Sequence, residues 1–196
     1  WEDVRVGSRE YAVWRLRVLA PGALHVNLGF TRFWLPKGAQ LSLYAADYRV
    51  GDDPERLRQF TARDNDSHGE LWIPLVPRTD SVIVELLVPP SLREHVKLVL
   101  GAINSGFRPI GDIKGISGSC NVDVACPQGD PYRNEIRAVG VLSRNGSALC
   151  TGSLINNTGA KRPLFITADH CGVRSNNAAT VVVYWNFQNS FCRPVN

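Results

Sequence analysis

Apolar and polar side chains alternate in short runs along the first hundred residues, with turn residues between the runs. In the earliest run, Trp14, Leu16 and Val18 fall on one face of an extended chain. Arg15 and Arg17 fall on the other face, which is the period-two pattern of a half-buried strand. Several short runs at this spacing favour an all-β sandwich. We expect strands at residues 11–18, 24–30, 41–44, 71–76, 81–88 and 96–100, and one helical turn at residues 54–60.

A stretch rich in glycine and proline separates this region from a second one. Residues 104–114 lack strand periodicity, so we interpret them as an exposed linker. The prediction is therefore a β-sandwich domain at residues 1–103 and a second, also mainly β, domain at residues 115–196. Asn145-Gly146 predicts a tight hairpin in the second domain, because both residues readily take positive φ angles. The strands expected there are residues 136–142, 149–155, 164–167 and 179–187.

Composition and charge exclude several classes of partner. The chain has 44% hydrophobic and 20% charged residues, which is ordinary for a soluble globular protein. Its net charge of +4 is mild and no basic block stands out, so we expect no nucleic-acid partner. No apolar run approaches the ~18 residues of a membrane-spanning helix, so we expect no membrane partner.

All five cysteines lie after residue 119, at positions 120, 126, 150, 171 and 192. Such density in one region is typical of an oxidising compartment, so we expect a secreted, extracellular protein. No two of them form a Cys-x-x-Cys pair, so a zinc site has little support, and we expect neither a metal nor another cofactor. The odd number leaves one cysteine without a partner in this chain.

One histidine, His170, follows a short apolar run and directly precedes a cysteine. The run Leu164–Thr167 leads into a turn that presents His170 directly beside Cys171. Histidine is the side chain best suited to take and return a proton near neutral pH. A lone histidine is weak support for catalysis, since most histidines are surface or core residues. Cys150 strengthens the case, because it lies in another strand-like run 21 positions before Cys171.

Two segments resemble a known protease family. Cys150-Thr-Gly-Ser-Leu-Ile155 and Thr167-Ala-Asp-His-Cys171 match, in order and spacing, the CGGSLI…TAAHC pair of trypsin-like serine proteases. The wider context resembles the bacterial lysyl endopeptidases, strongly in the second domain and more weakly in the first. That context consists of Gly115-Ile-Ser-Gly-Ser-Cys120, Cys126-Pro127 and Val181-Val-Val-Tyr-Trp-Asn186.

The resemblance implies a secreted serine endopeptidase precursor that acts on peptides or proteins. Residues 115–196 would form the first β-barrel of a two-barrel protease, and residues 1–114 would include an intramolecular pro-region that assists folding or holds the protease inactive. His170 would be the general base and acid of a Ser-His-Asp triad. The chain begins at Trp1 and ends at Asn196, so we expect a piece of a longer precursor whose serine, aspartate and specificity pocket lie elsewhere. The piece alone would be inactive.

The same resemblance implies the cysteine pairing. In the lysyl endopeptidases the pattern corresponds to Cys150–Cys171 and Cys126–Cys192. Cys120 would pair with a cysteine outside this chain; the alternatives are a free thiol and an intermolecular bridge.

A processing site is expected in the linker. Lys114 precedes Gly115, and mature lysyl endopeptidases begin with a similar Gly-x-Ser-Gly-Ser-Cys segment. A lysine-specific protease could therefore release its own pro-region by cutting between these two residues, although an ordinary linker lysine is the alternative. Gly115–Ser119 also imitates a serine nucleophile loop, but its position fits a mature N-terminus, so we do not assign Ser117 as the nucleophile.

The competing function is a non-catalytic secreted β-sandwich protein that binds carbohydrate or protein and carries a degenerate protease-like domain. Four tryptophans could offer a carbohydrate-binding face, although tryptophans at strand spacing are more often core residues. An acidic loop could suggest calcium, but it lacks the spacing of an EF-hand. The tryptophans are Trp1, Trp14, Trp34 and Trp72, and the acidic loop runs through Asp47, Asp52, Asp53, Asp64 and Asp66.

Overall fold

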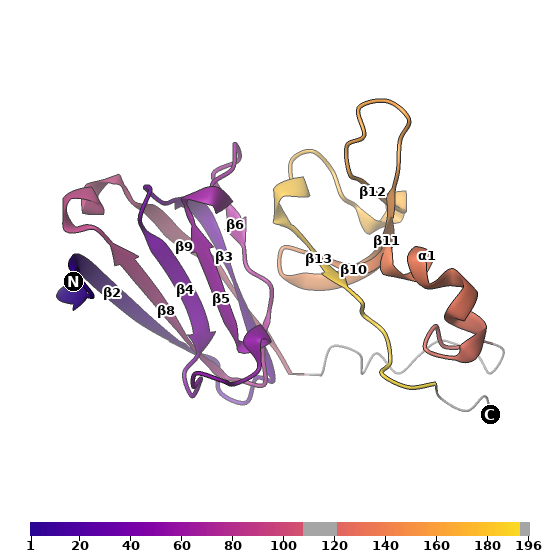
Figure 1. Cartoon of the computed structure of the whole chain (residues 1–196), viewed down its shortest axis with the longest axis horizontal. Coiled ribbons are helices and arrows are strands. Elements are labelled where there is room, and N and C mark those ends of the chain that lie inside the picture. The colour runs from indigo at the N-terminus through magenta and orange to yellow at the C-terminus, as the bar shows by residue number, and fades with distance from the viewer. Residues whose placement is uncertain (108–120, 193–196) are drawn as a thin grey trace. The chain divides into compact units, whose positions relative to one another are not determined.

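A computed structural model describes residues 1–107 and 121–192, the side chains of Ala148 and Leu149 excepted. The chain divides into two compact units, Trp1–Pro109 and Ile110–Asn196, both built mainly from β-strands (Figure 1). The prediction of a mainly β chain is confirmed. None of the helices in the described residues has the length and apolarity that a membrane crossing requires.

The first unit contains two antiparallel sheets. The five-stranded sheet has the order β1 (Glu2–Val6), β2 (Arg9–Leu19), β8 (Ser81–Val88), β4 (Gln40–Ala45) and β5 (Leu57–Thr61). The other sheet consists of β3 (His25–Trp34), β6 (Leu71–Trp72), β7 (Val76–Pro77) and β9 (Lys97–Gly106). In this second sheet, β9 pairs along one side of β3, and the short strands β6 and β7 pair along its other side. Three 3₁₀ helices connect strands, at Pro54–Arg56, Ala62–Asp64 and Pro90–His95.

The core of the first unit lies between these two sheets. Along β8, the apolar positions alternate as a half-buried strand requires, with Val82, Val84, Leu86 and Val88 all at most 2% exposed. They belong to one cluster with Val26, Leu28, Phe30 and Phe33 of β3, in the facing sheet, and with Leu41 and Leu43 of β4, the strand that pairs with β8 in the same sheet. Burying each such side chain contributes about 1.5–3 kcal/mol, so this shared layer holds the sandwich together.

The structure corrects the predicted end of this unit. Residues 104–106 were expected in the linker, but they continue β9, where Ser105 lies opposite Val26 and Gly106 lies opposite His25. Main-chain hydrogen bonds to β3 form regardless of side-chain polarity, so a polar strand end shows no hydrophobic period. Two smaller predictions were also wrong. The run 71–76 is interrupted into β6 and β7, and the helical turn ends at Arg56, so that residues 57–60 belong to β5.

We expect His25 to make the first unit sensitive to acid. Its ring lies over Gly106, where a methyl group would collide with it. Burial lowers the pKa of His25 below its usual 6.5, because desolvation disfavours the charged imidazolium. The unfolded chain then binds a proton more readily, so we expect the stability of this unit to fall as the pH drops below about 6.5 and to be unaffected above it.

Urea denaturation of the chain at pH 5 and pH 7.5 checks this expectation. His25→Gln should reduce the difference between the two midpoints, whereas His95→Gln, at an exposed position, should leave it unchanged. An equal pH dependence in wild type and His25→Gln would contradict the assignment to this histidine.

The described residues of the second unit form one antiparallel sheet, in the strand order β12-β11-β10-β13. The described pairings leave this sheet open, and its closure into the expected barrel remains a prediction. Residues 136–138 were expected to begin a strand, but a short helix occupies residues up to Arg137. The strands are β10 (Val139–Arg144), β11 (Ser147–Ile155), β12 (Leu164–Thr167) and β13 (Val181–Trp185); the helices are α1 (Arg133–Arg137) and 3₁₀ helices at Pro127–Tyr132, Asp169–Cys171 and Ala178–Thr180.

The hairpin between β10 and β11 is the one that Asn145-Gly146 predicted. Both residues have positive φ angles, 51° and 81°, and Arg144 pairs with Ser147 across the turn. The hairpin therefore places Arg144 at the end of the sheet, at the last position of β10.

Disulfides compensate for a small core in the second unit. Among its described residues, the buried apolar ones are Cys126, Leu142 and Cys171. Disulfides join Cys126 to Cys192 and Cys150 to Cys171, the two pairs that the resemblance implied. A core this small supplies little stability by itself, so cross-links are expected to contribute much of it. Cys120, the cysteine that belongs to neither pair, lies outside the described residues.

Candidate active site

His170 lies on a single 3₁₀ turn that begins where β12 ends. The turn is closed by two main-chain hydrogen bonds, from Cys171 to Ala168 at 3.0 Å and from Gly172 to Asp169 at 2.9 Å. Gly172 ends it with a φ of 65°, which glycine adopts without steric cost. The turn leaves His170 exposed while it buries the next residue, Cys171.

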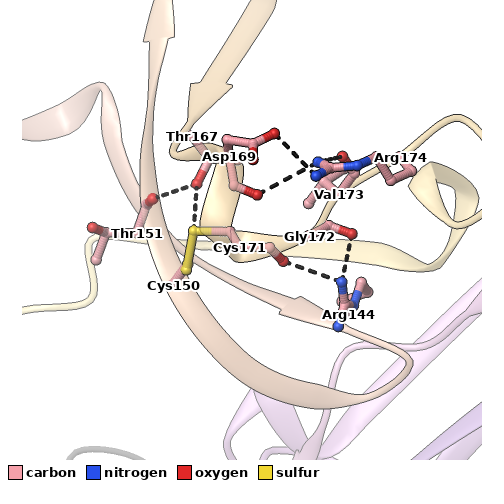
Figure 2. Close-up of a disulfide and its surroundings, with 9 residues drawn as sticks. All are labelled: Arg144, Cys150, Thr151, Thr167, Asp169, Cys171, Gly172, Val173 and Arg174. Atoms are coloured by element: carbon pink, nitrogen blue, oxygen red, sulfur yellow. Dashed lines mark hydrogen bonds and ion pairs between the residues drawn. A yellow bond between two sulfur atoms is a disulfide. The ribbon is translucent and has the colours of Figure 1, made fainter.

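A disulfide attaches this turn to the neighbouring strand. Cys171 is bonded to Cys150 of β11, and a ring nitrogen of His170 lies within 4.8 Å of both sulfur atoms. Thr167 reinforces the connection, because its hydroxyl donates to the main-chain carbonyl of Thr151 at 2.8 Å and lies 3.2 Å from the sulfur of Cys171 (Figure 2). The last residue of β12 and the residue after His170 are thus both tied to β11.

Two arginines contact the turn from outside it (Figure 2). The half-buried Arg144 donates from Nη1 to the carbonyls of Cys171, at 3.2 Å, and of Gly172. The exposed Arg174 forms an ion pair with Asp169 at 3.0 Å. Asp169 thus pairs with a solvent-exposed arginine, and because consecutive side chains do not normally point together we do not assign Asp169 the role of orienting His170.

An open hollow adjoins the turn on one face of the sheet. It has a volume of about 490 Å³. Val139 and Ile166, two of the apolar side chains that line it, are 45% and 55% exposed. The remaining lining residues are Thr151, Gly152, Ser153, Thr167 and Ala168. The side of the sheet next to His170 therefore offers room and apolar surface to another group.

The cysteines beside His170 do not make a thiolate metal site. Cys150, His170 and Cys171 place their ligand atoms close enough to share an ion. Zinc is bound by cysteine thiolates, however, and both sulfurs are in the disulfide. In the acidic loop, Asp47 and Asp52 both pair with Arg56, so these carboxylates are engaged by a cation of the chain itself.

Comparisons with known proteins point to the same segment. Residues 114–196 match the family model described as "Lysyl endopeptidase, C-terminal domain". A lysyl endopeptidase of Pseudomonas aeruginosa is 30% identical to the chain over 156 residues. The chain is a lysyl endopeptidase-related protein. The alignment with this relative covers 70% of the chain and 33% of the relative. The chain therefore spans about a third of the relative's length.

The structure brings three of the predicted site residues together and leaves others undescribed. His170 lies beside the Cys150–Cys171 disulfide, whereas the Cys126–Cys192 disulfide joins other parts of the same unit. The processing-site residues Lys114 and Gly115, together with Ser117 and Cys120, lie outside the described residues.

Sequence reasoning missed Arg144. Its hydrogen bonds run from a side chain to main-chain carbonyls 27 and 28 positions away, and such contacts leave no period or motif. The hairpin signal at Asn145-Gly146 could have indicated only that Arg144 ends a strand.

The tryptophans proposed for carbohydrate binding are divided between the two sheets of the first unit. Trp14 belongs to β2 of the five-stranded sheet, and Trp34 and Trp72 belong to the other sheet. Trp72 lies over Gly29, and Trp1, before β1, has the guanidinium of Arg93 5.7 Å from its ring. The four side chains do not line one strand or one sheet.

Proposed function

We propose that this chain is part of a secreted serine endopeptidase precursor that cleaves peptide bonds after lysine. The observation that carries the proposal is His170: an exposed imidazole on a disulfide-anchored turn, within the segment that matches the lysyl endopeptidase family model. A rigid turn suits a proton-transfer group, because catalysis needs the base held at a fixed distance from the reacting hydroxyl.

In the proposed reaction His170 takes the proton of a serine hydroxyl as that oxygen attacks the peptide carbonyl. It then gives the proton to the departing amine, and a buried aspartate keeps its ring in the required orientation. We place the serine and the aspartate in parts of the full-length protein that this chain does not include. The chain alone would therefore be inactive.

The apolar side of the sheet supports this division of the site. Ile166, Leu164 and Ile155 are between 42% and 55% exposed, as a surface would be that packs against further protein. The hollow beside them begins at the turn that carries His170. A second part of the protease seated there would bring its serine to the exposed imidazole.

Secretion and a pro-region complete the proposal. Two disulfides in one small unit favour an oxidising compartment. The first unit has a substantial core of its own and forms no part of the proposed catalytic site. It would act as the intramolecular pro-region, and the substrates of the mature enzyme would be peptides or proteins.

The test is an assay of the expressed full-length protein on matched Lys-x and Arg-x peptides. Hydrolysis after lysine that is lost with a serine-directed phosphonate would support the proposal, and the ratio of the two kcat/KM values would measure the preference. Absence of hydrolysis in a correctly folded, processed protein would overturn it and favour the binding-protein alternative.

The processing site makes a separate prediction. Lys114→Gln in the full-length precursor should prevent release of the pro-region, because lysine selection depends on the charge of the residue before the cut bond. Mass spectrometry of the secreted protein should find a mature N-terminus at Gly115 in wild type and not in the variant. Lys161→Gln, in a loop of the second unit, is the matched control and should be processed normally. Unchanged processing of Lys114→Gln would contradict self-cleavage at this bond.

A further inference from the structure

We propose that Arg144 is a positioning residue for His170. From the last position of β10, it would hold the turn Asp169–Cys171, which we call the catalytic turn. The inference rests on the proposed function, in which His170 transfers protons. Arg144 would not contact substrate; it would act on the main chain that carries the imidazole.

The contacts of Arg144 are concentrated on the end of that turn. Its Nη1 donates to the carbonyls of Cys171 and Gly172, the two residues that follow His170 (Figure 2). Hydrogen bonds from a charged donor are roughly twice as strong as those between neutral groups. No carboxylate among the described residues pairs with Arg144. The positive charge of this half-buried side chain is therefore directed at the turn.

Gly172 is shaped to receive the guanidinium. A methyl group on Gly172 would collide with Nη1 of Arg144. The residue thus serves two purposes at once: its φ of 65° ends the turn, and its missing side chain leaves the space that the guanidinium fills.

The same hairpin holds the far end of the segment that follows the turn. The main-chain N–H of Asn145 donates to the hydroxyl of Thr180 at 3.2 Å, and that hydroxyl donates to the carbonyl of Asn177 at 2.8 Å. Asn177 in turn donates from its side-chain amide to the carbonyl of Gly172 at 3.1 Å. Contacts of Arg144 and Asn145 therefore secure both ends of residues 172–180.

Arg144 supplies an anchor that the disulfide cannot. The bond between Cys150 and Cys171 fixes one side chain of the turn but does not involve the main-chain carbonyls of Cys171 and Gly172, so it does not by itself oppose rotation of these peptide groups. Hydrogen bonds to two successive carbonyls oppose that rotation, because both must be broken for the main chain to turn. With both anchors in place the main chain that carries His170 is held, and a displacement of about 1 Å in a catalytic group can cost ~100-fold in rate.

The test is Arg144→Met in the full-length protein, which removes the donors and keeps much of the side-chain volume. We expect kcat per folded molecule to fall about 10–100-fold with KM changed by less than about threefold, because in the proposed role Arg144 acts on His170 and does not contact substrate. The ring carbon resonances of His170, assigned by their loss in His170→Gln, should shift or broaden. Arg144→Lys, which keeps the charge, should recover part of the rate.

Arg174→Met is the matched control, since it removes an arginine that contacts the same turn at an exposed position, through an ion pair with the Asp169 carboxylate at 3.0 Å and a long hydrogen bond to the Asp169 carbonyl at 3.4 Å. It should change kcat by less than about threefold and leave the His170 resonances in place.

The outcomes separate this inference from the proposed function. Wild-type protein without His170-dependent hydrolysis would overturn the proposed function, while the resonances would still report on the contact between Arg144 and the turn. Arg144→Met with wild-type kcat per folded molecule and unchanged His170 resonances would overturn the positioning role. An equal effect of Arg174→Met would overturn it too, because any perturbation of the turn would then suffice.

Discussion

Replacing His170 by glutamine in the full-length protein is expected to lower kcat for Lys-x peptide hydrolysis by about 10⁶-fold. Glutamine has a side chain of similar size, but its amide is not basic and cannot accept the serine proton, so the attacking oxygen stays a weak nucleophile. The change should leave the fold intact, because the side chain is exposed and no hydrogen bond from its ring is found among the described residues. Comparison of kcat in wild type and variant, with near-UV circular dichroism as a check on folding, measures the effect.

Asp169→Asn provides the matched control for this experiment. Asp169 is the neighbour of His170 on the same turn, is exposed, and pairs with Arg174. Losing one exposed ion pair should change kcat by less than about threefold. A loss in Asp169→Asn as large as in His170→Gln would show that the turn as a whole, and not the imidazole, carries the activity. Full activity in His170→Gln would remove His170 from the mechanism.

Removing either disulfide should destabilise the second unit strongly, and the two effects should differ in size. Cys126→Ala with Cys192→Ala opens a loop with a sequence separation of 66, and Cys150→Ala with Cys171→Ala opens one of 21. The entropy of closing these loops in the unfolded chain corresponds to about 4 and about 3 kcal/mol of unfolding free energy, respectively. The described core of this unit is too small to compensate for either loss.

Urea denaturation of the full-length double variants, followed by near-UV circular dichroism, checks both the magnitudes and their order. The pair Cys150→Ala with Cys171→Ala should also lose more activity per folded molecule than the other pair, because it frees the turn of His170. Midpoints equal to that of wild type would show that neither cross-link restrains the unfolded chain. Equal activity of the two double variants would show that the Cys150–Cys171 bond does not hold the catalytic turn.

Local patterns were sufficient for much of the fold. The alternation in Ser81–Val88 identified a strand whose apolar positions are buried, and Asn145-Gly146 identified a hairpin, because both signals depend on residues within a few positions of one another. The strand that ends beside His170 was likewise visible as a short apolar run. Where hydrogen bonds to a distant partner decided the structure, as at residues 104–106 of β9 and at β5, the patterns failed.

The sequence by itself determined the main strands, the tight hairpin and the candidate histidine, since each is encoded by neighbouring side chains. Only the tertiary structure decided what holds that histidine. The hydrogen bonds of Arg144 to the turn, the ion pair of Asp169 with Arg174 and the hollow beside Ile166 all depend on how elements pack. Contacts between a side chain and a main-chain carbonyl far along the chain leave no period in the sequence, because any strand that brings the two together will serve.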